Sequence, residues 1–151
     1  LSLQTDHLDS FVSALTAHAN ESITEDQLTP GITLDCDAGL DELHVRAVER
    51  LQAMSPFGCG NAKPTIRVPN VVVADHPRQI GREGKHLDMR VRAGDSNNGR
   101  WLRCVWWGAG GRAADLASGM RLDLAVQPKL NTFNGTTRIE CELRDVRVCH
   151  S

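Results

Sequence analysis

Long apolar runs are absent from this sequence of 151 residues, and the longest ones have only the length of a strand. Residues 71–74, V-V-V-A, are an example. No segment resembles a signal peptide or a membrane span, so we expect a cytoplasmic protein with no membrane partner. The chain starts at Leu1 without a methionine, which favours a piece excised from a larger protein.

Paired cysteines are also missing, because the five cysteines include no C-x-x-C motif. An odd number without paired spacing argues against a disulfide framework and a zinc ribbon, so reduced thiols are expected. Asp35 and Asp37 have a spacing that could serve a metal, but no histidine or third carboxylate accompanies them. We therefore predict no catalytic residue, no metal site and no cofactor within this chain.

Basic residues are scarce in the first part of the chain. Residues 1–62 contain two basic and ten acidic residues, whereas residues 63–151 contain fifteen basic and nine acidic ones. A basic region beside an acidic one is typical of a polyanion-binding surface. Two solvated surfaces of opposite sign are the alternative.

Helical periodicity dominates the first sixty residues. Thr5 and Asp6 are candidate N-caps for a helix whose apolar face would contain Leu8, Phe11, Val12, Leu15 and Ala19. Residues 32–36 alternate like a short strand. Asp41 is expected to cap a second helix, with an apolar face that runs from Leu43 to Met54.

A period of two follows residue 64 and predicts five strands, within residues 65–73, 86–92, 100–107, 122–126 and 139–148. Pro69-Asn70 indicates an edge or a bulge in the first of them. Leu87, Met89 and Val91 would face the core in the second. In the third strand, either Leu102, Cys104 and Trp106 or Val105 and Trp107 could face inward, unless a bulge reconciles the two sets.

Five strands with a short helix at residues 112–117, between the third and fourth, fit an OB-type barrel. The predicted fold class is therefore α+β: a helical or α/β N-terminal segment followed by a five-stranded OB-type β-barrel. Such barrels bind oligonucleotides or oligosaccharides on the face of strands 2 and 3 and on the adjoining loops.

Basic residues fall on these elements. Cations contact phosphates, and aromatic rings stack on unpaired bases, although this chain has only three Trp, three Phe and no Tyr. The predicted nucleic-acid-binding residues are Arg78, Arg82, Lys85, Arg90, Arg92, Arg103, Lys129 and Phe133. The alternative is that the arginines only solubilise an outer face and Phe133 packs under its own loop.

A bend joins the helical and the alternating patterns. Residues 55–64 read S-P-F-G-C-G-N-A-K-P, and proline, glycine and asparagine favour an ordered turn. We interpret Phe57, Gly58, Gly60 and Asn61 as a structural joint, with Phe57 as a plug between helix and barrel and both glycines in unusual backbone conformations. A phosphate-cradling loop is the alternative, for which a lone G-x-G is weak support.

The same bend carries a family resemblance. Residues 51–61, L-Q-A-M-S-P-F-G-C-G-N, with Pro64 after them, resemble the L-x-P-F-G-x-G-N-P-x-P signature of the RecJ family of bacterial single-strand-specific DNA exonucleases. Residues 8–11, 32–43 and 131–135 resemble further elements of that family, so the likeness covers nearly the whole chain. Ala62-Lys63-Pro64 departs from the usual Pro-x-Pro.

The resemblance implies that residues 1–60 are the C-terminal part of the second lobe of a nuclease core with its connector, and that residues 61–151 are an OB-fold nucleic-acid-binding domain. The family's Asp-His-His and Gly-Gly-His motifs match nothing here, so no catalytic residue can be transferred.

It further implies that the parent protein is a manganese- or magnesium-dependent 5′-to-3′ exonuclease of DNA repair and recombination, with upstream catalytic domains. The present chain would bind single-stranded DNA. The alternative is a protein-interaction or structural module of a related DHH-type phosphoesterase.

Overall fold

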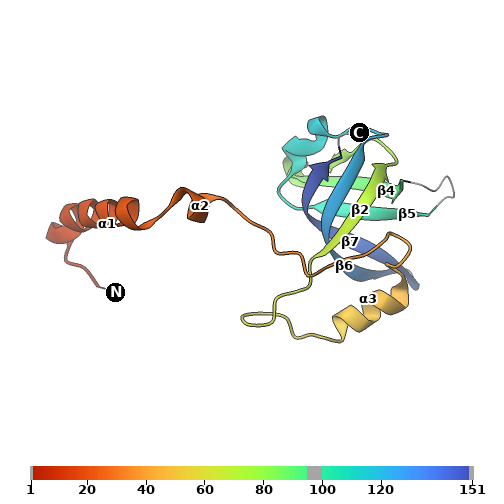
Figure 1. The fold of residues 1–151 in the computed structure, drawn as a ribbon, viewed down its shortest axis with the longest axis horizontal. Helices are drawn as coiled ribbons and strands as arrows, with labels where there is room; N and C mark the ends of the chain where they lie inside the picture. Colours follow the sequence, from red (N-terminus) through yellow and green to blue (C-terminus); the bar gives the residue numbers. More distant parts are fainter. Residues whose placement is uncertain (1, 95–99, 150–151) are drawn as a thin grey trace. The chain divides into compact units, whose positions relative to one another are not determined.

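The computed structural model describes residues 2–94 and 100–149, and the chain divides into two units, Leu1–Ile32 and Thr33–Ser151 (Figure 1). The first unit contains the 3-10 turn η1 (Thr5–His7) and the helices α1 (Leu8–Ser22) and α2 (Glu25–Leu28). Thr5 and Asp6 lie in η1 and do not cap α1, so that prediction was wrong. The apolar face of α1 is present, but none of its residues is buried.

A mixed sheet of seven strands forms the second unit, in the order β1-β2-β6-β7-β5-β4-β3. β2 also pairs with β4, so β2, β6, β7, β5 and β4 form a ring of pairings. The strands are β1 (Cys36–Asp37), β2 (Ile66–Val73), β3 (Arg78–Ile80), β4 (His86–Ala93), β5 (Trp101–Trp106), β6 (Arg121–Phe133) and β7 (Thr136–Val148).

The prediction of five strands was wrong in number. The five predicted strands correspond to the members of the ring, and the sheet adds β1 and β3. These have two and three residues, which is too short to show a period of two. The predicted strand at residues 32–36 overlaps β1 only at Cys36.

Alternation placed the core correctly. Leu87, Met89 and Val91 of β4 are buried in one hydrophobic cluster together with side chains from the other long strands. In β5, Leu102 and Cys104 belong to this cluster, and Trp106 packs against it. The pairing of β5 with β4 is unbroken from Trp101 to Trp106, so no bulge is needed, and Trp107 is exposed beyond the strand.

The interruption predicted in β2 is a bulge. The register of β2 against β6 shifts between Val68 and Val71, where Pro69 and Asn70 lie, and Asn70 has a φ of 52°. The Asn70 backbone N–H donates to Asp123 Oδ1 at 3.0 Å. This carboxylate on β6 therefore supports the irregular backbone of β2.

Short helices flank the sheet. α3 (Val45–Gln52) contacts β6 and β7, and Figure 1 shows it next to the end of β6. Its Val48 is buried. Its N-cap is His44, whose Nδ1 accepts from the Ala47 N–H, and not Asp41 as predicted. The 3-10 turns η2 (Arg82–Gly84) and η3 (Gly110–Asp115) precede β4 and β6. No helix in the described part of the chain is both long and apolar enough to cross a bilayer.

The bend after α3 is held by Asn61. Its Nδ2 donates to the carbonyl oxygens of Met54 and Pro56 at 3.1 and 2.8 Å, and its backbone pairs with Gly58. Gly60 has a φ of 80°, which favours glycine, but Gly58 does not need such an angle, so the prediction was wrong there. Phe57 is half-buried and lies outside the core cluster, so its role as a plug between helix and barrel stays a prediction.

Candidate nucleic-acid interface

Four polar side chains lie in one row across the sheet, on the face opposite the core. Arg90 on β4 is in register with Arg103 on β5, Arg103 with Glu140 on β7, and Glu140 with Lys129 on β6. Because strand residues in register point to the same side, the row brings together residues that are far apart in the sequence. Three of the four belong to the predicted binding set.

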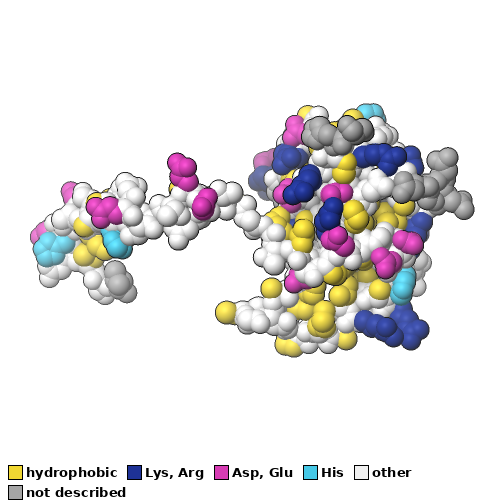
Figure 2. Space-filling model, viewed as in Figure 1, with side chains coloured by type: hydrophobic (Ala, Val, Ile, Leu, Met, Phe, Trp, Pro, Cys, Tyr) yellow, Lys and Arg dark blue, Asp and Glu magenta, His cyan; other side chains and the backbone are white. Residues whose placement is uncertain are grey.

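Two buried carboxylates hold the cations of this face. Asp88 and Glu140 are 5% and 6% exposed. Asp88 accepts from Arg78 at 2.8 Å and from Arg103 Nε at 2.7 Å, and Glu140 accepts from Arg103 and from Lys129 Nζ at 2.9 Å. Figure 2 shows basic and acidic side chains interspersed on the visible face of this unit. Carboxylates therefore lie between the cations of this face, which is not a uniform basic patch.

The ion pairs shift the pKa values of Glu140 and Arg103. Burial by itself would raise the pKa of Glu140, but the hydrogen bond and charge of Lys129, together with Arg103, outweigh it and hold that pKa below its usual value. The hydrogen bond to Asp88 raises the pKa of Arg103 above its usual value, against the opposing effect of burial. Both groups therefore stay charged at neutral pH.

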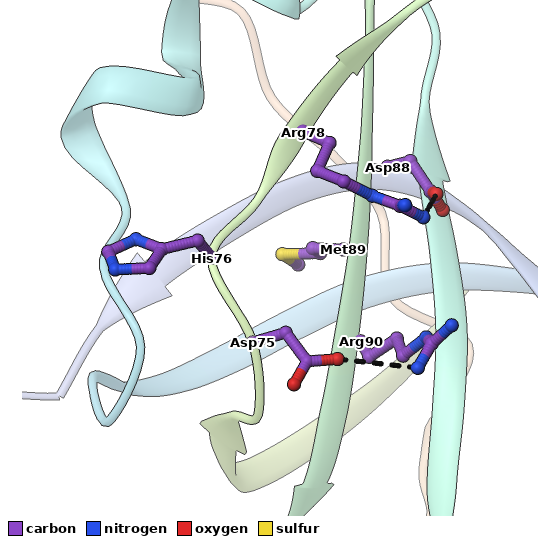
Figure 3. A pocket seen from close by; sticks show the side chains of 6 residues that line it. All are labelled: Asp75, His76, Arg78, Asp88, Met89 and Arg90. Atoms are coloured by element: carbon purple, nitrogen blue, oxygen red, sulfur yellow. Dashed lines mark hydrogen bonds and ion pairs between the residues drawn. The ribbon is translucent and has the colours of Figure 1, made fainter.

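A small hollow lies where β4 parts from β2. It has a volume of about 340 Å³ and is lined by Asp75, His76, Arg78, Asp88, Met89 and Arg90. Figure 3 shows Met89 between two ion pairs, Arg78 with Asp88 and Arg90 with Asp75, while the ring of His76 points away from them. The Arg90–Asp75 pair is long, at 3.5 Å, and both side chains are exposed. Arg90 is therefore only weakly neutralised.

A larger groove of about 900 Å³ lies beside the start of β5. One wall is residues 100–103 with the start of α3, and the other is the turn between β6 and β7. Its basic side chains are Arg100, Arg103 and Arg138, and its exposed rings are Trp101 and Phe133. It thus combines cations, which can contact phosphates, with flat aromatic rings, which can stack on unpaired bases.

Arg90 and Trp101 connect the hollow with the groove. The Arg90 guanidinium lies over the Trp101 ring, 4.6 Å from its centre. Arg90 lines the hollow, and Trp101 lines the groove. Arg103 lines the groove while it bonds Asp88 of the hollow.

The structure brings some predicted residues together and leaves others apart. Four of the predicted residues lie in or beside the ion-pair network, namely Arg78, Arg90, Arg103 and Lys129. Phe133 lines the groove. Arg82 and Lys85 belong to the segment around η2 and line neither depression, and Lys85 pairs with Glu83 at 3.2 Å. Arg92, opposite Trp101 in β4, is half-buried. Whether any of these residues contacts DNA stays a prediction.

Sequence reasoning missed several groove residues. Trp101, Arg100 and Arg138 were not selected, and neither was His44. Trp101 follows an arginine and is exposed, so an alternation that puts Leu102 and Cys104 inside could have indicated its outward position. No local pattern indicated that α3 would contribute a wall, because that contact joins distant segments.

Metal ligation does not fit the side chains that the structure describes. Within residues 2–94 and 100–149, no three His, Cys, Asp or Glu side chains come together around a possible ion position. Asp35 accepts from the Thr65 N–H at 2.8 Å, and Asp37 pairs with Arg67 at 3.0 Å. Asp35 and Asp37 are thus engaged in holding β1 and the residue before it to β2.

Comparison with known proteins identifies relatives over the whole length. The RecJ OB domain family model matches residues 34–145. The single-stranded-DNA-specific exonuclease RecJ of Bacillus subtilis (strain 168) is 26% identical over 148 residues, which are 98% of this chain and 18% of that protein.

Crystal structures of RecJ from Thermus thermophilus are similar in fold. The complex with Mn²⁺ has a TM-score of 0.68 at 22% identity and covers 100% of this chain and 20% of the other. The complex with Mg²⁺ has a TM-score of 0.66 at 21% identity, with 99% and 21% covered. The chain spans about a fifth of the relatives it matches. Because the family model matches residues 34–145, which contain most of the sheet, this chain belongs to the RecJ OB domain family.

Proposed function

We propose that this chain is the single-stranded-DNA-binding C-terminal portion of a RecJ-like 5′-to-3′ exonuclease that acts in DNA repair and recombination. The observation that carries the proposal is the polar row with its ion pairs, in which Asp88 and Glu140 hold Arg103 and Lys129, beside a hollow and a groove with exposed rings. The name of the Bacillus subtilis relative, a single-stranded-DNA-specific exonuclease, supports the choice of polymer.

A strand on this face would meet cations and rings in alternation. Arg78, Arg90 and Lys129 would contact phosphates, while Trp101 and Phe133 would contact bases. The buried carboxylates neutralise part of the positive charge, so we expect weak binding that depends strongly on salt. Strand polarity and the repair role rest on the family likeness.

In the proposed parent enzyme, catalytic domains upstream of residue 1 would hold manganese or magnesium. That ion would supply an activated water for phosphodiester hydrolysis. The residues of the present chain would bind and orient the strand, and the boundary near residue 60 would separate the nuclease core from the OB domain.

Fluorescence anisotropy with labelled single- and double-stranded oligonucleotides at several salt concentrations tests the proposal. We expect a preference for the single strand. The double variant Arg90→Ala/Arg92→Ala should flatten the slope of log affinity against log salt by about 0.7 for each of the two arginines that contacts a phosphate. Arg144→Ala/Arg147→Ala is the matched control, since these arginines are exposed on β7 and line neither depression.

The two double variants separate the competing functions. Equal affinity of the Arg90→Ala/Arg92→Ala variant and the parent protein at every salt concentration would exclude this face. Absence of binding to any oligonucleotide would favour the alternative, a protein-interaction or structural module of a related phosphoesterase.

A further inference from the structure

We infer that the turn between β6 and β7 is a site of self-modification, at which Asn134 and Gly135 react and the Asn134 amide becomes a carboxylate. The site belongs to the groove, because Asn134 is one of the residues that line it. A new negative charge there would repel the phosphates of a bound strand. This effect on binding rests on the proposed function, whereas the reaction itself does not.

The reaction joins a backbone nitrogen to the neighbouring side chain. The nitrogen of Gly135 attacks Cγ of Asn134, a bond forms between the two atoms, and the bond between Cγ and Nδ2 breaks. Ammonia leaves with the proton of the Gly135 N–H, and a cyclic imide remains. Solvent water then opens the ring at either carbonyl carbon, which yields aspartate or its β-linked isomer. Water is the only co-reactant.

The turn exposes both reacting groups. The last pair of the β6–β7 hairpin is Phe133 with Thr136. Asn134 and Gly135 alone therefore connect the two strands, and all residues from 131 to 138 are exposed. An added Cβ at Gly135 would meet no other part of the chain within 4 Å. The attacking nitrogen is consequently not shielded by a distant side chain.

Glycine after asparagine serves both the turn and the reaction. Asn134 has a φ of 48° and Gly135 a φ of 74°, the left-handed values that a tight Asn-Gly hairpin turn requires. Glycine also lacks the Cβ that would hinder the approach of its nitrogen to Cγ. Ring closure needs rotation of the Asn134 backbone, so we expect it when the exposed end of the hairpin frays.

Two other asparagines of this unit are held by hydrogen bonds. The Asn131 Nδ2 on the same hairpin donates to Glu140 Oε2 at 3.4 Å. The Asn61 Nδ2 in the bend donates to two carbonyl oxygens, and both residues precede one that has a side chain. Among the described residues, by contrast, no hydrogen bond of the Asn134 side chain is found. We therefore expect the reaction at Asn134 and not at Asn131.

Peptide mapping by mass spectrometry tests the reaction. The 151-residue chain is incubated in mildly alkaline buffer, which favours loss of the backbone amide proton, and is then cut with trypsin. The peptide of residues 130–138 should gain the mass of an amide-to-acid exchange at Asn134. Asn134→Gln should leave this peptide unmodified, because the longer side chain would have to close a larger ring. The other Asn-Gly pair, residues 98–99, lies outside the described residues and falls in a different peptide.

Asn131 is the internal control, because it lies in the same peptide. A peptide that stays unmodified, or one in which Asn131 reacts as fast as Asn134, overturns the inference.

Asn134→Asp reproduces one product and tests its effect on binding. Aspartate tolerates the left-handed backbone as asparagine does, so the turn should persist. In anisotropy titrations at low salt, a labelled thymidine oligonucleotide should bind this variant about fivefold more weakly than the parent, the effect of one unit charge about 4 Å from a phosphate in water. The difference should shrink at high salt, because ions screen the added charge.

Asn20→Asp is the matched control for the change of charge. Asn20 is exposed on α1 and lines neither depression, so this variant should bind like the parent. Parental affinity of Asn134→Asp at low salt would overturn the effect on binding. A parent that binds no oligonucleotide would overturn the proposed function and this effect with it, and the mass of the peptide would still decide whether the turn reacts.

Discussion

Glu140 is the residue on which the polar row depends. Its carboxylate is buried and accepts hydrogen bonds from Arg103 on β5 and from Lys129 and Asn131 on β6. A buried charge is tolerated only where such partners replace water. The lowered pKa of Glu140 expresses the same balance, because the partners stabilise the ionised form by more than burial destabilises it.

We predict that Glu140→Gln lowers the free energy of unfolding by about 1–2 kcal/mol at pH 7, since an ionic hydrogen bond is lost. The folded pKa of Glu140 lies below its unfolded value, so its stabilisation is complete above that value and is lost as the pH falls through the folded pKa. The difference between parent and variant should therefore shrink below about pH 4.5, the ordinary value.

Urea denaturation between pH 7 and pH 3 measures this difference. Glu142→Gln is the control, because Glu142 lies on the same strand and forms a weaker, more exposed ion pair with Arg144 at 3.3 Å. A Glu140→Gln difference that stays constant down to pH 3 would contradict the assigned ion pairs.

At the scale of elements, the bulge in β2 depends on a side chain of β6. Asp123 Oδ1 accepts from the Asn70 N–H and from Cys149 Sγ at 3.3 Å, and Oδ2 accepts from Arg67 at 2.9 Å. Burial would raise the pKa of Asp123, but the Asn70 N–H and Arg67 outweigh it and lower the pKa. The irregular strand is thus stabilised by one carboxylate.

Asp123→Ala should destabilise the chain by about 2 kcal/mol, because it leaves the Asn70 N–H and its neighbours without this acceptor. Chemical denaturation at pH 7 provides the measurement. Asp145→Ala serves for comparison, since Asp145 is exposed and accepts from the adjacent Val146 N–H. Equal stability of the two variants would show that the bulge needs no support from Asp123.

The bend after α3 offers a second test at this scale. Gly60 has a φ of 80°, whereas an added Cβ at Gly58 would meet no atom within 4 Å and needs no such angle. Gly60→Ala should therefore cost about 1 kcal/mol of stability, and Gly58→Ala should cost much less. Differential scanning calorimetry can resolve the two. A larger loss for Gly58→Ala would reverse the assignment of the strained position.

At the scale of the whole molecule, the chain represents about a fifth of its relatives. The part of the chain that the structure describes contains no cluster of metal ligands. Under the proposed function, this chain would bind and orient the strand.

We predict that the purified chain does not degrade a labelled single strand in the presence of manganese, and that manganese leaves its melting temperature unchanged. Gel analysis of the oligonucleotide and thermal melting are the measurements. Degradation that disappears in the variant Asp35→Ala/Asp37→Ala would refute this prediction, because the spacing of these two carboxylates could serve a metal.

Periodicity and composition were sufficient for much of the fold. Alternation in residues 86–92 and 122–126 identified the side chains of the hydrophobic core, since the side-chain period of a strand is a local property of the backbone. Proline and asparagine at 69–70 indicated the bulge for the same reason. The motif at residues 51–61 indicated the family, which the match over residues 34–145 confirms.

Tertiary structure alone decided which of these side chains meet. The pairing of β4, β5, β7 and β6 brings Arg90, Arg103, Glu140 and Lys129 into one row. Register arises from packing across the whole sheet, so no local pattern contains it. Arg100 likewise joins β5 to the segment before α3 and completes a groove from three separate parts of the chain. Sequence therefore indicated the kinds of residue at the candidate interface, and long-range pairing determined their arrangement.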